Sequence, residues 1–161
     1  MRYMKIDRRR RYFRRWFTGS AVVDSLGRPL MVYHGTPARF QRFRTSEDGG
    51  FHFGDRAAAG WRLADLTGDE GTAGNRILGV YLAIQRPKLL DFDAGDASSW
   101  RKQIRQAKRE GFDGIRYLNS VELDQDFNTG DPISTWSWVA FKPEQIKIVL
   151  NQRAPTLSSD A

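Results

Sequence analysis

The feature that most constrains the fold of this chain is a series of short apolar runs, each closed by glycine, proline or polar residues. Runs of this length with alternating apolar residues indicate β-strands, because an amphipathic helix needs a longer stretch. We expect seven strands, over residues 21–24, 30–33, 51–54, 77–84, 112–118, 136–141 and 146–150. We further expect residues 89–93 to lie along a sheet edge, and the first two strands to pair as a hairpin.

Three segments have helical patterns. Residues 1–17 combine a stripe of aromatic side chains with arginines on the other side, which predicts a short amphipathic helix. Asp55 is suited to cap the alanine-rich helix that follows it. Ser98 or Ser99 is suited to begin a third helix, which Gly111 ends.

The order of these segments predicts the fold class. Strands and helices alternate irregularly, and the turns are too tight for regular β-α-β crossovers. We therefore predict an α+β fold with largely antiparallel sheets. The predicted organisation is a basic arm at residues 1–20, one domain at residues 21–151 and a polar tail at residues 152–161.

The composition excludes several classes of protein. The chain has no cysteine, so disulfides, thiolate zinc sites and cysteine nucleophiles are ruled out. No apolar run approaches the roughly 20 residues that a membrane-spanning helix needs. The basic start lacks the apolar region of a secretory signal, so the sequence predicts no such signal, and we expect no membrane partner.

The net charge of +7 is confined to one end of the chain. Residues 1–20 contain eight Lys and Arg side chains against Asp7, whereas the remainder carries equal numbers of basic and acidic side chains. This distribution leaves two interpretations. The arm either docks its aromatic side chains on the core with its arginines in water, or binds an acidic partner or phosphates through Arg8 to Arg15.

Both histidines of the chain lie in similar surroundings. His34 follows an apolar run and is followed at once by Gly35 and Thr36, where backbone groups and a hydroxyl can converge on a ligand. His52 lies between Phe51 and Phe53, just before a glycine and the helix cap. We expect these two segments to form opposite walls of one pocket.

Six segments, taken in order, resemble an ADP-ribosyltransferase domain of the type found in phage and mobile-element polyvalent proteins. This type is distantly similar to poly(ADP-ribose) polymerases and diphtheria toxin. The resemblance rests on residues 13–24, 29–36, 50–55 with the following helix, 80–82, 111–115 and 138–147. It implies split antiparallel β-sheets flanked by short helices, NAD⁺ as a substrate and no metal. It also implies action in a bacterial cytoplasm, after delivery by a phage or as a secreted effector.

The resemblance implies roles for the first motif. His34 would hydrogen-bond a hydroxyl of the adenosine ribose, which either neutral tautomer of imidazole can do. Gly35 would offer its backbone N–H and C=O to the nicotinamide carboxamide, and Thr36 would support the adenosine side. Tyr33 belongs to the same expected NAD⁺-binding surface.

The second motif is expected to hold the nicotinamide ring. An aromatic side chain stacks on nicotinamide in related enzymes, and His52 falls at that position, flanked by Phe51 and Phe53. We take His52 as a catalytic residue and the two phenylalanines as binding residues. Trp61 is another candidate for stacking, although a core-facing helix residue is the simpler interpretation of it.

The catalytic glutamate of the family is missing from its usual strand. Ser137 falls at that position and cannot supply a negative charge. We assign the role to Glu122, which follows in an Asn-x-x-Glu pattern, with Asp124 or Asp126 as alternatives. Glu144 is expected to be an exposed turn residue.

Together these features predict an NAD-dependent mono-ADP-ribosyltransferase that cleaves the bond between nicotinamide and ribose. We expect it to transfer ADP-ribose to a macromolecular target, a protein. One alternative is a catalytically silent NAD-binding or interaction module. Another is an enzyme acting on RNA or DNA with the same fold, such as an RNA 2′-phosphotransferase. A metal hydrolase is disfavoured because no histidine spacing suited to a metal appears. Nothing in the sequence positions a carboxylate pair for glycoside hydrolysis.

Overall fold

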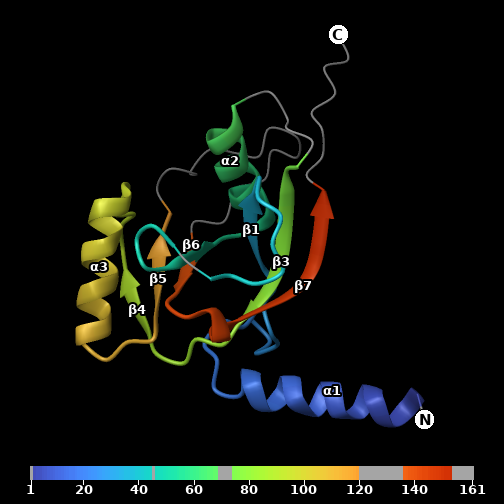
Figure 1. Cartoon of the computed structure of the whole chain (residues 1–161). Helices are drawn as coiled ribbons and strands as arrows, with labels where there is room; N and C mark the ends of the chain where they lie inside the picture. Colours follow the sequence, from blue (N-terminus) through green and yellow to red (C-terminus); the bar gives the residue numbers. More distant parts are fainter. Residues whose placement is uncertain (1, 45, 69–73, 120–135, 154–161) are drawn as a thin grey trace.

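The computed structural model describes residues 2–44, 46–68, 74–119 and 136–153 (Figure 1). Its helices are α1 (Arg2–Phe17), α2 (Arg56–Thr67) and α3 (Ala97–Arg109), with a 3₁₀ turn at Pro143–Gln145. Its strands are β1 (Val32–Thr36), β2 (Phe51–Phe53), β3 (Arg76–Leu82), β4 (Pro87–Leu90), β5 (Gly114–Leu118), β6 (Trp136–Ala140) and β7 (Ile146–Arg153). This inventory confirms the predicted α+β class.

The strands form two separate sheets. One has the order β1-β3-β7 and is antiparallel throughout, while the other has the order β2-β6-β5-β4. In the second sheet β4 and β5 are parallel and the other pairs are antiparallel. The two sheets meet where Tyr33 of β1 and Gly54 exchange backbone hydrogen bonds of 2.7 and 3.0 Å.

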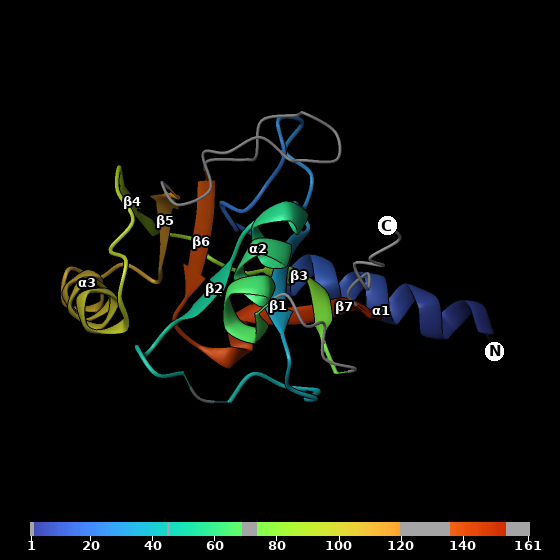
Figure 2. The same ribbon diagram turned by 90° about the horizontal axis from the view of Figure 1, so that it is seen from above.

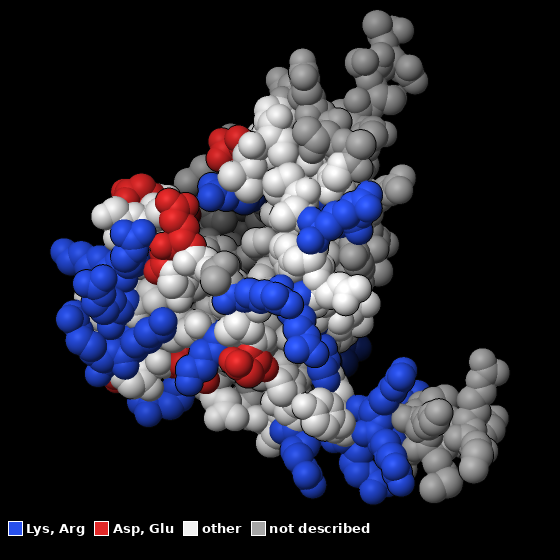
Figure 3. All heavy atoms as spheres, viewed as in Figure 1, with Lys and Arg blue, Asp and Glu red and all other residues white. Residues whose placement is uncertain are grey.

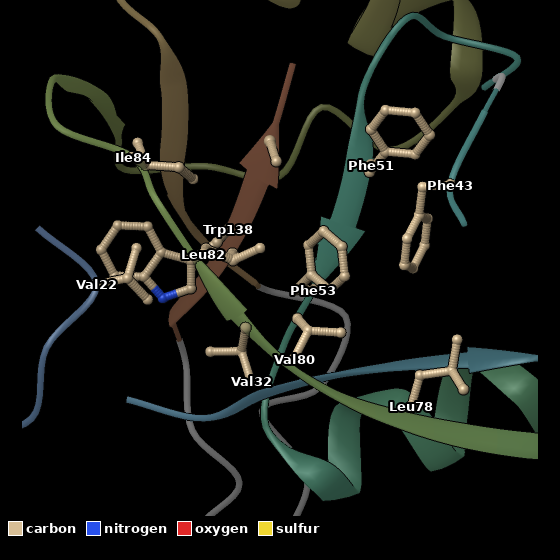
Figure 4. Close-up of a cluster of buried hydrophobic side chains, with 11 residues drawn as sticks. Val22, Val32, Phe43, Phe51, Phe53, Leu78, Val80, Leu82, Ile84 and Trp138 are labelled. Atoms are coloured by element: carbon tan, nitrogen blue, oxygen red, sulfur yellow. The ribbon is translucent and has the colours of Figure 1, made fainter. Parts of the chain in front are cut away.

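The main core lies between the two sheets (Figure 4). Val32, Val80 and Leu82 reach it from the first sheet, and Phe53 and Trp138 reach it from the second. All are nearly fully buried, and burial of such side chains contributes about 1.5–3 kcal/mol each before entropy is counted. This core fixes the position of one sheet relative to the other, and the cleft described below depends on that arrangement.

One face of the β2-β6-β5-β4 sheet is covered by α3. α3 packs Trp100, Ile104 and Ala107 against the face of the sheet that carries Tyr117 and Val139. The N-cap of α3 is Asp96, whose carboxylate accepts a 2.9 Å hydrogen bond from the Ser99 amide.

α2 packs on β1 at a glycine. Ala59 and Leu63 of the helix form a small cluster with Ile77 of β3, and Asp55 caps the helix as predicted, with a 2.7 Å bond from the Ala58 amide. A Cβ atom at Gly35 would overlap the carbonyl oxygen of Ala59. The close approach of α2 to β1 therefore requires glycine at position 35.

α1 lies at the end of the molecule away from α2 (Figures 1 and 2). Phe13 packs edge-on against Tyr81 with ring centres 5.2 Å apart, and the Trp16 Nε1–H donates to the Glu144 carbonyl at 2.9 Å. The aromatic side of the arm thus docks on the body, and its described arginines are exposed. Glu144 is exposed in its turn, as predicted.

The predicted hairpin over residues 21–33 forms only next to its turn. Val23 and Pro29 make an isolated antiparallel bridge, flanked by backbone bonds from the Asp24 N–H to the Arg28 carbonyl at 2.8 Å and from the Leu30 N–H to the Val22 carbonyl at 3.1 Å, but residues 21–24 form no strand. The Asp24 carboxylate accepts bonds of 2.9 Å from the Leu26 and Arg28 amides, which closes the tight turn. The strand starts at Val32, pairs with β3 and continues through the motif, so His34 and Gly35 lie within a strand rather than after it.

Three smaller predictions also need correction. β4, α3 and β5 form a parallel β-α-β crossover, which the tight turns had seemed to exclude. The cap of α3 is Asp96 rather than Ser98 or Ser99, because an aspartate three residues ahead of the Ser99 amide reaches it with a charged acceptor. The last strand also continues to Arg153, past the predicted end of the domain.

No helix in the described part of the chain has the length and apolar character needed to cross a membrane.

Gly35→Ala should destabilise the protein by about 1–3 kcal/mol, because α2 must move away from β1 to admit the new Cβ. Urea unfolding followed by circular dichroism measures the change. The matched control is Gly60→Ala within α2, where an added Cβ meets nothing within 4 Å. This control should stabilise the protein by about 0.5–1 kcal/mol, since alanine favours helix over glycine. Equal effects of the two substitutions would contradict the packing role of Gly35.

Candidate active site

His34 of β1 is fixed by a hydrogen bond to the opposite sheet. Its Nδ1 lies 2.8 Å from the carbonyl oxygen of His52. A carbonyl can only accept, so Nδ1 carries the hydrogen and Nε2 of the neutral ring is left as an acceptor. The ring is half-buried among Phe40, Phe43 and Phe53, at centre distances of 5.2–6.5 Å.

The surroundings of His34 keep its imidazole neutral. Burial lowers the pKa of His34 below its ordinary value of 6.5, and the charges of His52 and Arg62 act in the same direction. These effects outweigh the hydrogen bond to the His52 carbonyl, which favours the protonated ring. Nε2 therefore presents a lone pair suited to a hydroxyl donor such as a ribose.

The peptide groups of Gly35 face away from β3. Tyr33 directs its N–H and C=O toward Gly54 of the other sheet. Residues two apart on a strand direct their peptide groups to the same side, so Gly35 presents its N–H and C=O on that side too. A donor and an acceptor side by side are the groups that a carboxamide requires.

His52 of β2 lies on the opposite face of its strand from Phe51 and Phe53. Its ring packs edge-on against Trp100 at 4.9 Å and faces Tyr117 at 6.2 Å. Its Nε2 lies 2.7 Å from Oδ2 of Asp48. The carboxylate fixes the ring orientation and places a hydrogen on Nε2, which leaves Nδ1 as the second polar atom of the neutral ring.

Asp48 is a buried carboxylate with several donors. Burial raises its pKa, but the hydrogen bond and charge of His52, helped by the Gly50 amide and the Ser46 hydroxyl, lower the pKa to about 2. The loop that carries Asp48 is tied to α3, since Arg101 donates to the Glu47 carbonyl at 2.9 Å. The site thus holds a fixed negative charge beside His52.

These residues line one cleft of about 1360 Å³ between α2 and the segment leading into α3. Figure 3 shows this hollow, with acidic side chains toward the α3 side and basic side chains crossing the surface below it. The charged side chains that line the cleft are four arginines and four carboxylates: Arg39, Arg42, Arg44, Arg62, Glu47, Asp48, Asp65 and Asp93. The cleft is large enough for a dinucleotide, given that ligand pockets span roughly 300–1,000 Å³.

The predicted binding residues contribute to this cleft in different ways. Tyr33 lines it and lies under the Arg56 guanidinium, 5.9 Å from the ring centre. The Thr36 hydroxyl is buried and accepts a 3.1 Å bond from the Ala38 amide. Phe51 and Phe53 also line the cleft, although both are almost fully buried as part of the main core.

The simpler interpretation of Trp61, a helix residue that faces the core, is wrong. Trp61 is 42% exposed and lines the cleft from α2. An exposed indole on the wall of a pocket is available to stack on a planar ring.

The position expected for the family glutamate holds a neutral pair. Ser137 of β6 is 1% exposed and lines the cleft, and its Oγ accepts a 3.2 Å bond from Asn119 Nδ2. Glu122, Asp124 and Asp126 lie outside the described residues, so their assignment stays a prediction. Within the described ranges, no three His, Asp or Glu side chains are grouped to hold a metal ion.

Asp48 is the site residue that sequence reasoning missed. Its partner His52 is only four positions away, but the intervening Gly49 and Gly50 obscure the relation. An aspartate followed by two glycines indicates a tight turn, which would bring the two side chains to the same end of the strand.

A family model described as "ADP-Ribosyltransferase in polyvalent proteins" matches residues 24–156 of the chain. Comparison with curated proteins gives no match.

The lowered pKa of His34 should make stability depend on pH. Below the ordinary value of 6.5 the unfolded chain binds a proton that folded His34 does not, so the free energy of unfolding should fall as the pH drops from 6.5 through the folded pKa. Urea unfolding at pH 7.5 and 5.5 measures this slope, which should be smaller in His34→Gln.

NMR of the imidazole nitrogens gives an independent control. At a pH where both rings are neutral, His34 should show the Nδ1–H tautomer and His52 the Nε2–H tautomer. The site geometry would be refuted by the same tautomer in both rings, or by an unchanged pH slope in the variant.

Proposed function

The chain belongs to the family of ADP-ribosyltransferases in polyvalent proteins, and on this basis we propose that its cleft binds NAD⁺ and transfers ADP-ribose to a macromolecular target. The finer proposal is mono-ADP-ribosyl transfer to a protein. NAD⁺ is a substrate in this reaction, and no metal takes part.

The proposed reaction exchanges one bond at C1′ of the nicotinamide ribose. The bond to the pyridinium nitrogen breaks and its electron pair leaves with neutral nicotinamide, while C1′ gains oxocarbenium character. A nucleophile of the target then forms a bond to C1′ and gives up its proton to a base. Fixed negative charge near C1′ stabilises the transition state more than the ground state.

The observation that carries this proposal is the pair of polar groups that β1 presents at the cleft. The N–H and C=O of Gly35 lie on the side of the strand away from β3, as a carboxamide would require. Nε2 of His34, one residue earlier, is an acceptor suited to a ribose hydroxyl. Their order along β1 agrees with a bent NAD⁺ that has nicotinamide at Gly35 and adenosine ribose at His34.

His52 and Asp48 supply a second set of groups. We assign His52 to the nicotinamide end of the cleft and Asp48 as the residue that positions it through the 2.7 Å bond. Trp61 can share the stacking of the ring from α2. Glu122 remains our proposed acid for the hydroxyl of the nicotinamide ribose.

The cleft opens at the surface, which supports a large acceptor (Figure 3). A protein side chain can approach C1′ from solvent without passing through the core. This accessibility supports a macromolecular acceptor over a small molecule enclosed in the site.

A silent NAD-binding module is the second candidate, and Ser137 favours it. The hydroxyl pairs with the neutral Asn119 at the position where the family carries its glutamate. In this alternative the cleft binds NAD⁺ but the glycosidic bond is not cleaved.

His34→Gln should weaken NAD⁺ binding about tenfold, because it disturbs one hydrogen bond to the ligand. Calorimetry measures the affinity, and chromatography measures nicotinamide release. Asp91→Asn is the matched control, since this carboxylate is exposed and does not line the cleft. It should leave both quantities unchanged. Binding by the native protein without release of nicotinamide would establish the silent module, and absence of binding would refute both candidates.

Glu122→Gln should lower nicotinamide release about 100-fold with little change in NAD⁺ affinity, as expected for a charge that acts in the transition state. Asp48→Asn should lower release about tenfold and alter its pH profile, because His52 loses its anionic partner. Asp48→Glu, which restores the charge, should recover part of the rate. Full activity of Glu122→Gln would disprove that assignment, and an unchanged pH profile in Asp48→Asn would leave Asp48 only a structural role.

A further inference from the structure

α1 carries the excess positive charge of the chain. Residues 1–20 contain seven arginines, one lysine and one aspartate, a net charge of +7 that equals the net charge of the whole sequence. α1 also precedes the stretch at residues 24–156 that the family model matches. None of its residues lines the cleft, so this charge serves a different surface.

The described arginines of α1 are exposed and ordered along the helix. They form two neighbouring rows, with Arg8, Arg11 and Arg15 in one and Arg10 and Arg14 in the other. Figure 2 shows α1 extending beyond β7, and Figure 3 shows basic side chains gathered on it. The rows therefore project from the body, where a long partner can reach them.

The opposite side of α1 is occupied by the body of the protein. Phe13 and Phe17 pack on Tyr81, and Trp16 donates to the Glu144 carbonyl. A membrane-binding helix needs such an apolar face free to enter the lipid. The docked aromatics therefore argue against a lipid surface as the partner.

A groove of about 820 Å³ runs between α1 and the outer face of β7. Its apolar lining includes Phe13, Tyr81 and Val149, and its basic residues are Arg8, Arg9 and Lys147. Tyr12 also lines the groove and is 65% exposed, with the Lys147 ammonium 4.6 Å from the centre of its ring. The groove thus combines cations with an exposed aromatic ring.

We propose that α1 and this groove bind single-stranded nucleic acid. Guanidinium groups pair bidentately with phosphates, and α1 uses arginine almost to the exclusion of lysine. Unpaired bases stack on aromatic side chains, a role for which Tyr12 is placed among the cations. An acidic protein segment could pair with the arginines, but it would leave the exposed ring of Tyr12 without a role. A nucleic-acid duplex keeps its bases stacked inside and could not stack one on that ring.

Fluorescence anisotropy with a labelled 20-nucleotide oligo(dT) tests the proposal on the full chain. Replacing Arg10, Arg14 and Arg15 with Gln should weaken binding at least tenfold and reduce the slope of log K against log salt by about 2. Tyr12→Ala should weaken binding about fivefold and leave that slope unchanged, because it removes stacking and no charge. Glutamine keeps the helix propensity of α1, which circular dichroism can verify.

The matched control is the triple replacement of Lys102, Arg105 and Arg109 with Gln on α3. These side chains are exposed and carry the same total charge, so their loss should change affinity less than twofold. Equal losses from the α1 and α3 variants would overturn the proposal in favour of non-specific attraction. Tighter binding of a 20-base-pair duplex, or equal binding of a polyglutamate peptide, would likewise overturn it. These readouts need no NAD⁺, so the outcome is independent of the proposed enzymatic activity.

Discussion

The crossing of β1 and β2 is the constraint on which the cleft depends. These strands belong to different sheets, yet they are joined by the two backbone bonds between Tyr33 and Gly54 and by the bond from His34 Nδ1 to the His52 carbonyl. The side-chain bond is the unusual one, because it makes the orientation of one histidine depend on the backbone of the other. A neutral, buried His34 is the form that suits this arrangement, and the phenylalanines around it disfavour the charged form. The fold therefore determines that Nε2 of His34, and not Nδ1, is the ring atom that can accept a hydrogen bond from a ligand.

Local chemistry made much of the fold predictable. Asp55 capped its helix as expected, and the strand and helix order indicated an α+β fold with both motifs facing one another. The hairpin extends no further than the bridge between Val23 and Pro29, and alternation alone could not show that β1 pairs with a strand more than 40 residues later. The sequence indicated only one of the two reasons for a glycine at position 35. A carboxamide gives one reason for glycine there, but the nearer reason is the contact with α2, which only three-dimensional packing reveals.

The catalytic charge poses a different problem from the binding groups. Ser137 is nearly fully buried, and a Cβ placed on Gly54 would lie 3.1 Å from its hydroxyl. This close packing suits a small neutral side chain, so the negative charge of the proposed reaction is assigned to another residue. The Asp48 carboxylate is ionised and bound by three donors, the His52 ring, the Gly50 amide and the Ser46 hydroxyl, so its charge is already paired with that ring. A carboxylate engaged in this way can orient a histidine more readily than it can approach C1′, which is why the acid is assigned to Glu122 and the positioning role to Asp48.

The distribution of charge separates recognition from chemistry. The cleft balances its arginines with carboxylates, as befits a substrate that carries both a pyridinium and a pyrophosphate. The excess charge lies on α1, which is attached through Tyr81, Lys147 and the Glu144 carbonyl to the far side of the β1-β3-β7 sheet. This attachment uses aromatic contacts, the Lys147 ammonium and one hydrogen bond from the Trp16 indole to a backbone carbonyl, and Arg8 to Arg11, Arg14 and Arg15 stay exposed. A polyanion bound to α1 could therefore be held by the same molecule without entering the cleft or competing with NAD⁺, since no residue of α1 lines that site.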